Sequence, residues 1–195
     1  MRIGVFDSGL GGLTIVAAMF RHLHGVEIIY VADTANAPYG EKTPEQILAL
    51  SVRMTEYLIS HHRIDALVVA CNTATSAAIS QLREKYPDLI IVGTEPGLKP
   101  AISHSKTKKV GVLATPATLG GQKYKALVSM LCDHYRVRVY EQPCPGLVQQ
   151  IESGETDAPQ TLEMLEEWLK PMRDADVDTI VLGCTHYPLV ADAIR

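Results

Sequence analysis

The sequence has few cysteines for its length, and none of them belongs to a metal-binding or redox motif. Four are spread over 195 residues: Cys71, Cys132, Cys144 and Cys184. No two are separated by two residues, which argues against a zinc ribbon and a thioredoxin-type dithiol. A chain of this length can bury enough apolar surface to fold without disulfide bonds. Each thiol therefore needs its own explanation, and we predict no metal site.

The sequence also lacks a surplus of positive charge and a long apolar run. Its 18 lysines and arginines are mixed among 22 aspartates and glutamates, and the formal net charge is −4. There is no basic stripe for nucleic acid and no run long enough to span a bilayer. The stretch MRIGVFDSG enters a strand-like run at once, without the features of a secretion signal. We therefore predict a cytoplasmic protein that binds neither nucleic acid nor membrane.

Strand-like and helix-like segments alternate along the chain. The strand-like runs are at 2–6, 26–32, 66–70, 89–93, 109–114, 136–141 and 178–183. Most are separated by stretches with apolar residues at helical spacing. This alternation predicts βαβ units and an α/β fold of doubly wound parallel sheets. The glycine- and proline-rich stretch GTEPGLKP indicates a domain boundary, so we predict domains at 1–95 and 96–195.

Two of the expected helices have clear start signals. Thr43, Pro44 and Gln46 have the pattern of an N-cap, a first-turn proline and a capping box. Thr115 and Pro116 open another helix in the same way. These signals predict where two helices begin.

Two distant segments share one pattern. IDALVVACNT (64–73) and VDTIVLGCTH (177–186) each contain an aspartate, an apolar stretch and, six residues after the aspartate, a cysteine. One copy falls in each predicted domain. The pattern indicates two pseudo-symmetric domains, each with a thiol at the carboxyl end of a parallel strand, where ligands of open α/β sheets bind.

The position of each cysteine separates two thiols from the other two. Cys71 and Cys184 each follow a strand, next to the amides of a coming helix, where thiolate is favoured. Cys132 lies in a helical pattern and Cys144 beside two prolines, so both are typical of buried structural cysteines. Because Cys71 and Cys184 form a matched pair, we interpret them as functional rather than structural cysteines.

Polar residues at other strand ends are candidate partners for these thiols. The stretch FDSGLGG (6–12) has the shape of a glycine-rich anion loop but lacks the lysine of a phosphate-binding loop. In a doubly wound sheet its Asp7 and Ser8 can face Cys71, although Asp7 could also serve only as an N-cap. His186 lies two residues beyond Cys184 and is a plausible acid/base partner.

Two facing thiols suit disulfide chemistry or the inversion of a carbon centre. Inversion needs a base on one face of the carbon and an acid on the other, and their roles exchange in the reverse direction. Because free cysteine is mostly protonated near neutral pH, each thiol needs a neighbour that tunes it. Asp7 near Cys71 and His186 near Cys184 would supply this.

Five motifs in order carry a family resemblance: GVFDSGLGG, APYGEK, VVACNTAT, CPGLVQQIESGE and VLGCTHYPL. With them the chain resembles the glutamate racemases of the cofactor-independent aspartate/glutamate racemase superfamily over essentially its whole length. The resemblance implies two domains with the active site in the cleft between them. It also implies interconversion of L- and D-glutamate without a cofactor, as a source of D-glutamate for bacterial peptidoglycan, and a homodimer.

The resemblance also implies catalytic roles. Cys71 would act on the D-enantiomer with help from Asp7. Cys184 would act on the L-enantiomer with help from His186. Glu152 matches a family carboxylate near the second thiol, with a solvated glutamate at a helix end as the alternative interpretation.

Substrate contacts follow from the same motifs. Hydroxyls and amides at helix starts suit the α-carboxylate of the substrate. The residues implied are Asp7, Ser8, Tyr39, Gly40, Asn72, Thr73, Thr185 and His186, with Asp33 as a supporting candidate.

Other interpretations stay open. One is a racemase of aspartate or another small acid from the same superfamily. A second is a non-catalytic binding protein for an amino acid or small anion, and a third is a dithiol redox protein, which the absence of CxxC argues against. Family members normally continue beyond the second cysteine motif and return to the first domain, whereas this sequence stops at Arg195.

Overall fold

The computed structural model describes residues 1–195, and its strands form two separate parallel sheets. The first has the order β2-β1-β3-β4, made of β1 (Arg2–Asp7), β2 (Glu27–Ala32), β3 (Ala66–Val69) and β4 (Ile90–Gly93). The second has the order β6-β5-β7, made of β5 (Lys109–Ala114), β6 (Arg138–Pro143) and β7 (Thr179–Leu182). All predicted strands are confirmed, with ends displaced by at most two residues.

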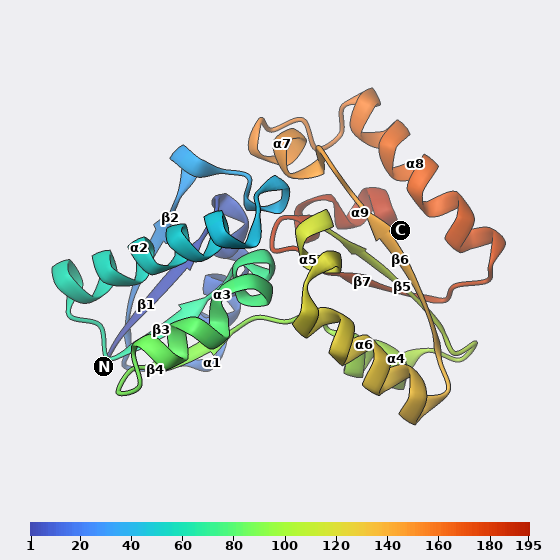
Figure 1. Cartoon of the computed structure of the whole chain (residues 1–195). Coiled ribbons are helices and arrows are strands. Elements are labelled where there is room, and N and C mark those ends of the chain that lie inside the picture. Colours follow the sequence, from blue (N-terminus) through green and yellow to red (C-terminus); the bar gives the residue numbers. More distant parts are fainter.

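Helices cover both faces of each sheet (Figure 1). On the first sheet, α1 (Leu13–His22) packs on one face, and α2 (Pro44–His62) and α3 (Asn72–Lys85) pack on the other. On the second, α4 (Leu98–His104) and α6 (Gln122–Tyr135) oppose α7 (Leu147–Glu152) and α8 (Pro159–Asp174). The short α5 (Pro116–Gly120) and α9 (Ala191–Ile194) complete the helices. No helix has both the length and the hydropathy that crossing a membrane requires.

The two predicted helix starts are confirmed. The Thr43 hydroxyl accepts a hydrogen bond from the Gln46 amide at 3.3 Å, and the Gln46 side chain accepts one from the Thr43 amide at 3.0 Å. The Thr115 hydroxyl accepts a hydrogen bond from the Thr118 amide at 3.2 Å. Both caps therefore satisfy amides that the first helical turn leaves free.

The repeated sequence pattern corresponds to a repeated structure. The order β2-β1-β3 in the first sheet recurs as β6-β5-β7 in the second. Asp65, before β3, accepts a hydrogen bond from the Arg2 amide at 2.6 Å, where β1 begins. Asp178, before β7, accepts hydrogen bonds from the amides of Lys106 and Thr107 at 2.7 and 2.9 Å, just before β5. The two aspartates thus anchor the amino ends of corresponding strands, and the cysteines lie at the carboxyl ends.

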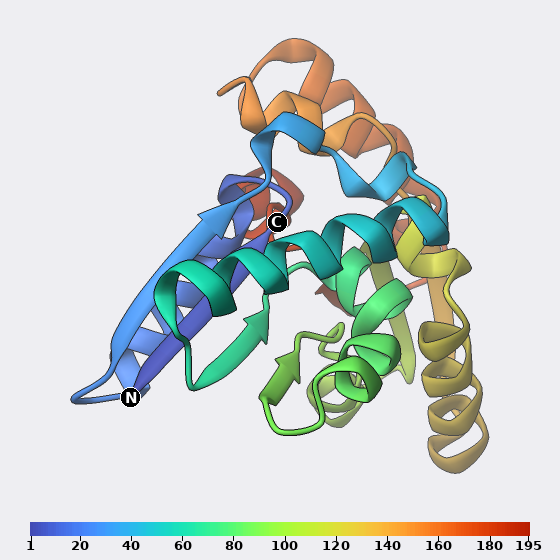
Figure 2. The same cartoon turned by 60° about the vertical axis from the view of Figure 1, so that its left-hand side comes forward.

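The segment after β2 reaches across to the second sheet (Figure 2). It contains two 3₁₀ helices, η2 (Thr34–Asn36) and η3 (Tyr39–Glu41). The side chain of Gln149 in α7 donates a hydrogen bond to the Glu41 carboxylate at 2.6 Å. The two sheets come from residues 2–93 and 109–182, whereas the domain boundary between 95 and 96 stays a prediction.

Candidate active site

Cys71 lies at the carboxyl end of β3 and is the N-cap residue of α3. The Ala74 amide donates a hydrogen bond to its Sγ at 3.5 Å, and Sγ lies 3.8 Å from the Ser8 hydroxyl. Ser8 follows β1, the strand that pairs with β3, so adjacent strand ends bring the two side chains together. The predicted neighbourhood of Cys71 and Ser8 is therefore present.

Cys184 lies at the corresponding end of β7, followed by the 3₁₀ helix η4 (Tyr187–Val190). Its Sγ lies 3.7 Å from Nδ1 of His186. Both cysteines are buried, with exposed fractions of 5% for Cys71 and 8% for Cys184. Each sheet thus contributes one enclosed thiol.

Burial dominates the acidity of both thiols. Burial and, to a smaller extent, Asp7 raise the pKa of the Cys71 thiol to about 12, and the Ala74 amide and Ser8 offset only part of the shift. Burial also raises the pKa of Cys184, with smaller contributions from Cys71 and Asp7. The helix amides favour the thiolate, as the sequence predicts, but removing a thiolate from water costs more than these amides return. Both side chains are neutral thiols at pH 7.

Asp7 connects the two halves at the centre of the site. It is the last residue of β1 and is fully buried. Its Oδ2 accepts hydrogen bonds from the amides of Gly9 at 3.2 Å and Gly12 at 3.0 Å, and its Oδ1 accepts one from the Thr185 hydroxyl at 3.3 Å. Burial raises its pKa, partly offset by His186 and these donors. Sequence reasoning paired Asp7 with Cys71 alone, whereas in the structure its charge acts on both thiols.

His186 is held by a carboxylate from the end of α7. Oε1 of Glu152 lies 2.5 Å from Nε2 of His186 and accepts a hydrogen bond from the Leu10 amide at 2.7 Å. A contact this short to a carboxylate places the hydrogen on Nε2. The Gly11 amide, 3.3 Å from Nε2, then meets no free lone pair. The lone pair of Nδ1 faces Cys184, and Glu152 is not merely a solvated helix-end residue.

The amides of the glycine-rich loop after β1 donate hydrogen bonds to side chains of the site itself. The amides of Gly9 and Gly12 bind Asp7, and that of Leu10 binds Glu152. A side chain at Gly9 would collide with Glu152, and one at Gly11 would collide with the ring of His186. The predicted anion loop is therefore present, but the anions that it binds are carboxylates of the same chain.

Tyr39 and Gly40 lie where the segment after β2 meets the second half. The Tyr39 hydroxyl donates a hydrogen bond to Asp33 at 2.7 Å, and Asp33 also forms an ion pair with Arg53 at 3.5 Å. A Cβ at Gly40 would lie 2.7 Å from Thr115, so the backbone approaches the N-cap of α5 closely there. Asp33 thus orients Tyr39, and contact of Tyr39 and Gly40 with a substrate stays a prediction.

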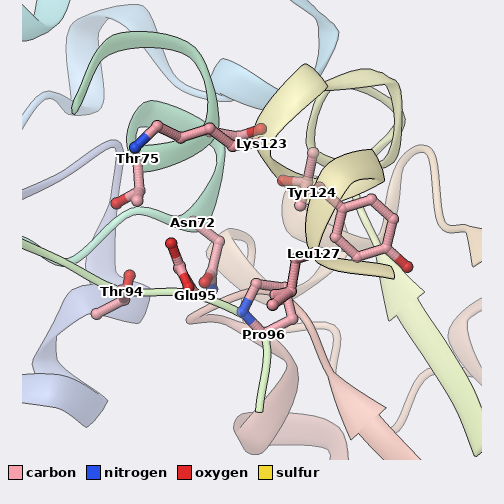
Figure 3. Close-up of a pocket in the computed structure, with 10 residues that line it drawn as sticks. Asn72, Thr75, Thr94, Glu95, Pro96, Lys123, Tyr124 and Leu127 are labelled. Atoms are coloured by element: carbon pink, nitrogen blue, oxygen red, sulfur yellow. The ribbon is translucent and has the colours of Figure 1, made fainter. Parts of the chain in front are cut away.

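Asn72 and Thr73 both face the junction of the two halves. The Thr73 hydroxyl lies 2.8 Å from that of Thr115 and 3.1 Å from that of Thr118, which makes a buried hydroxyl cluster. In the sequence Thr115 has only the signal of a helix cap, and nothing local marks Thr118. Asn72 lines a small pocket of about 20 Å³ with Thr94 and other residues (Figure 3), and its Oδ1 has no hydrogen-bond partner. Their substrate contacts stay predictions.

The sequence model of the family described as Asp/Glu/Hydantoin racemase matches residues 3–195. A glutamate racemase of Sulfurovum sp. (strain NBC37-1) is 64% identical over the whole chain, which covers 74% of that protein. One of Aliarcobacter butzleri (strain RM4018) is 55% identical, again over the whole chain and 75% of that protein. The chain belongs to the Asp/Glu/Hydantoin racemase family.

Solved structures of family members agree in fold. A glutamate racemase of Bacillus anthracis has a TM-score of 0.87 at 35% identity, covering 98% of this chain and 71% of that one. One of Francisella tularensis, solved in complex with D-glutamate, has a TM-score of 0.83 at 32% identity, covering 99% and 72%. One of Escherichia coli, solved with L-glutamate and an activator, has a TM-score of 0.85 at 31% identity, covering 99% and 72%. The predicted family resemblance and two-domain α/β fold are thus confirmed.

Proposed function

We propose that this protein interconverts L- and D-glutamate by proton transfer between the substrate and two thiols. The observation that carries the proposal is the matched pair Cys71 and Cys184, one at the end of a strand in each sheet. Glutamate is favoured over aspartate because four relatives at 45–64% identity carry the name glutamate racemase. An aspartate racemase of Picrophilus torridus shares only the fold, at 17% identity and a TM-score of 0.57.

In the direction from L- to D-glutamate, Cys184 removes the α-proton and Cys71 supplies one to the opposite face. Before this step the Cys184 proton moves to Nδ1 of His186, 3.7 Å away, and leaves a thiolate beside an imidazolium. The Glu152 carboxylate at Nε2 stabilises that imidazolium, much as an aspartate does in a serine protease triad. After the step Cys184 is a thiol, Cys71 is a thiolate and the carbon is inverted. The reverse reaction exchanges these roles.

The fully buried Asp7 influences the protonation of both thiols. Its charge disfavours thiolate at either cysteine, and its own raised pKa lets it carry a proton closer to neutral pH than an exposed carboxyl does. The mechanism needs only one of the two cysteines as thiolate at a time. A single acidic residue next to both, Asp7, is therefore compatible with thiols that exchange roles. The amides of Gly9 and Gly12 keep its carboxylate in place.

The substrate would enter the site from the side of Glu152. A groove of about 260 Å³ lies between the segment after β2, at Pro38, and α7, and Glu152 lines it. The Glu152 side chain is 25% exposed, whereas that of His186 is 1% exposed. Opening between this segment and α7 would admit glutamate, and closure would exclude water from the reacting carbon.

The direct test is circular dichroism of L-glutamate with purified protein and no added cofactor. The signal should decay to zero, and D-glutamate should give the mirror-image decay. In heavy water both enantiomers should acquire deuterium at the α-carbon. If only aspartate loses its signal, the protein is an aspartate racemase, and if neither changes, the racemase proposal is wrong.

Three cysteine variants test the two-thiol mechanism. Cys71→Ala and Cys184→Ala should each abolish racemisation, because each leaves one face of the carbon without an acid or base. Cys132→Ala is the matched control, because this half-buried thiol lies in α6 outside the site, and it should keep wild-type activity. Wild-type activity in Cys71→Ala would rule out the two-thiol mechanism while leaving the reaction itself in place.

Three expectations remain part of this proposal. They are the use of D-glutamate in peptidoglycan, a cytoplasmic location and a homodimer. The names of the bacterial relatives are consistent with the first of these. Size-exclusion chromatography with light scattering tests the dimer.

A further inference from the structure

Tyr30 is the one phenol whose hydroxyl contacts the backbone of the glycine-rich loop. It lies on β2, paired with Val5 of β1. From there its hydroxyl donates a short hydrogen bond to the carbonyl oxygen of Gly9. Nothing in the sequence marks Tyr30 as functional, because a tyrosine within a strand is ordinary.

The geometry points to Tyr30 as a positioning residue for the acid/base groups of the site. Gly9 is held at both of its polar groups: its amide donates to Asp7, and its carbonyl accepts from Tyr30. The next amide along, that of Leu10, holds Glu152. Fixing the Gly9 carbonyl therefore fixes the peptides that orient Asp7 and Glu152. Because Glu152 sets the tautomer of His186, the hydroxyl acts on the acid/base groups of both halves.

The packing around Gly12 gives a second, independent observation. A Cβ there would lie 2.5 Å from the Cβ of Asp7 and 2.7 Å from the hydroxyl oxygen of Tyr30. The Gly12 backbone is therefore enclosed between these two side chains, and its amide donates to Asp7 at 3.0 Å. The loop has no room to shift toward β2 while the tyrosine is in place.

The chemistry of a phenol suits this position. The acidic groups around it are Asp7, Glu152 and Cys71, and each of them, together with burial, raises the pKa of Tyr30. With its pKa raised, the hydroxyl is neutral at pH 7, so it donates to Gly9 without adding charge. A charged donor such as lysine would stabilise Asp7 in its ionised form, which would work against its carrying a proton.

This inference rests on the proposed function only for its kinetic readout. Tyr30→Phe removes the hydroxyl and keeps the ring. Loss of one hydrogen bond of ordinary strength predicts about a tenfold fall in kcat, with KM changed less than about twofold. Tyr140→Phe is the matched control: this half-buried tyrosine lies on β6, the counterpart of β2, and its hydroxyl makes no hydrogen bond. It should leave kcat unchanged.

A second measurement does not depend on activity. Amide hydrogen exchange at Leu10 and Gly12 should be faster in Tyr30→Phe than in wild type and unchanged in Tyr140→Phe. Unchanged exchange, or a kcat equal to that of wild type, overturns the positioning role. A fall in kcat accompanied by a loss of melting temperature and general faster exchange would show a merely structural role. If wild type does not racemise glutamate, the proposed function fails, while the exchange measurement still decides the role of Tyr30.

Discussion

Oε1 of Glu152 lies 2.5 Å from Nε2 of His186, which joins the end of α7 to the loop after β7. Glu152→Gln keeps the shape of this side chain but replaces a charged acceptor by a neutral one. The imidazolium loses its counter-charge, so we expect kcat/KM to fall about 10- to 100-fold. Because L- and D-glutamate are equally stable, it must fall by the same factor in both directions, which circular dichroism can measure.

The control for this variant is Glu155→Gln, which changes an exposed glutamate three residues further along. It should keep wild-type kcat/KM. Wild-type kinetics in Glu152→Gln as well would contradict the role of the carboxylate in holding His186.

The raised pKa of Cys71 predicts slow and strongly pH-dependent alkylation. With a pKa of about 12, the thiolate fraction rises tenfold per pH unit through pH 7 to 9, and only the thiolate reacts. Site-resolved mass spectrometry after iodoacetamide should show this slope in the folded protein. In urea the same cysteine should level off above pH ~8.5, the ordinary value. A plateau in the folded protein near pH 7 would show that burial does not control this thiol.

The close approach at Gly40 predicts that a single methyl group is costly. In Gly40→Ala the new Cβ would lie 2.7 Å from both Cβ and Cγ2 of Thr115, so η3 and the start of α5 must separate. Overpacking of this kind lowers the free energy of unfolding by about 1–3 kcal/mol. In the control Gly120→Ala, no atom lies within 4 Å of the new Cβ. Denaturant unfolding should separate the two variants, and equal stabilities would refute the close contact.

The hydrogen bonds to the Asp178 carboxylate should stabilise the folded protein at neutral pH and lose this effect in acid. The Ser105 hydroxyl, followed by the amides of Thr107 and Lys106, holds the pKa of its carboxyl well below the usual range. A lowered folded-state pKa stabilises the protein above the unfolded-state value of about 3.9, and this contribution is lost as pH falls through the folded-state value. Asp178→Ala should therefore lower the melting temperature at pH 7.

The same variant should differ less and less from wild type as the pH is lowered below about 4. Asp88→Ala, at an exposed aspartate without a hydrogen bond, is the control and should leave the melting temperature unchanged at every pH. A difference for Asp178→Ala that stays constant down to the acid transition would contradict this account.

Local sequence patterns predicted most of the fold. Most strands are short runs rich in β-branched or other apolar residues, so their period and length are readable within a window of a few residues. The caps at Thr43 and Thr115 are equally local, because a cap and its amide are three residues apart. The equivalence of Cys71 and Cys184 could also be predicted from the sequence, since the same residue pattern precedes both.

Contacts between distant segments were not readable in this way. Tyr30 and Gly9 lie on different elements, as do Leu10 and Glu152, and no spacing in the chain encodes either hydrogen bond. The glycines of the loop were visible, but their partners were not, so an anion loop was predicted without its internal carboxylates.

The sequence by itself determined that two α/β units each carry a thiol at the end of a parallel strand, because periodicity and strand-end position are local properties. The tertiary structure decided the charge state of those thiols. Helix amides near Cys71 favour thiolate, but the packing of both units around the thiols excludes water, and burial outweighs the amides. It also decided that Asp7 lies next to both thiols, because only the folded chain brings the end of β1 against Thr185.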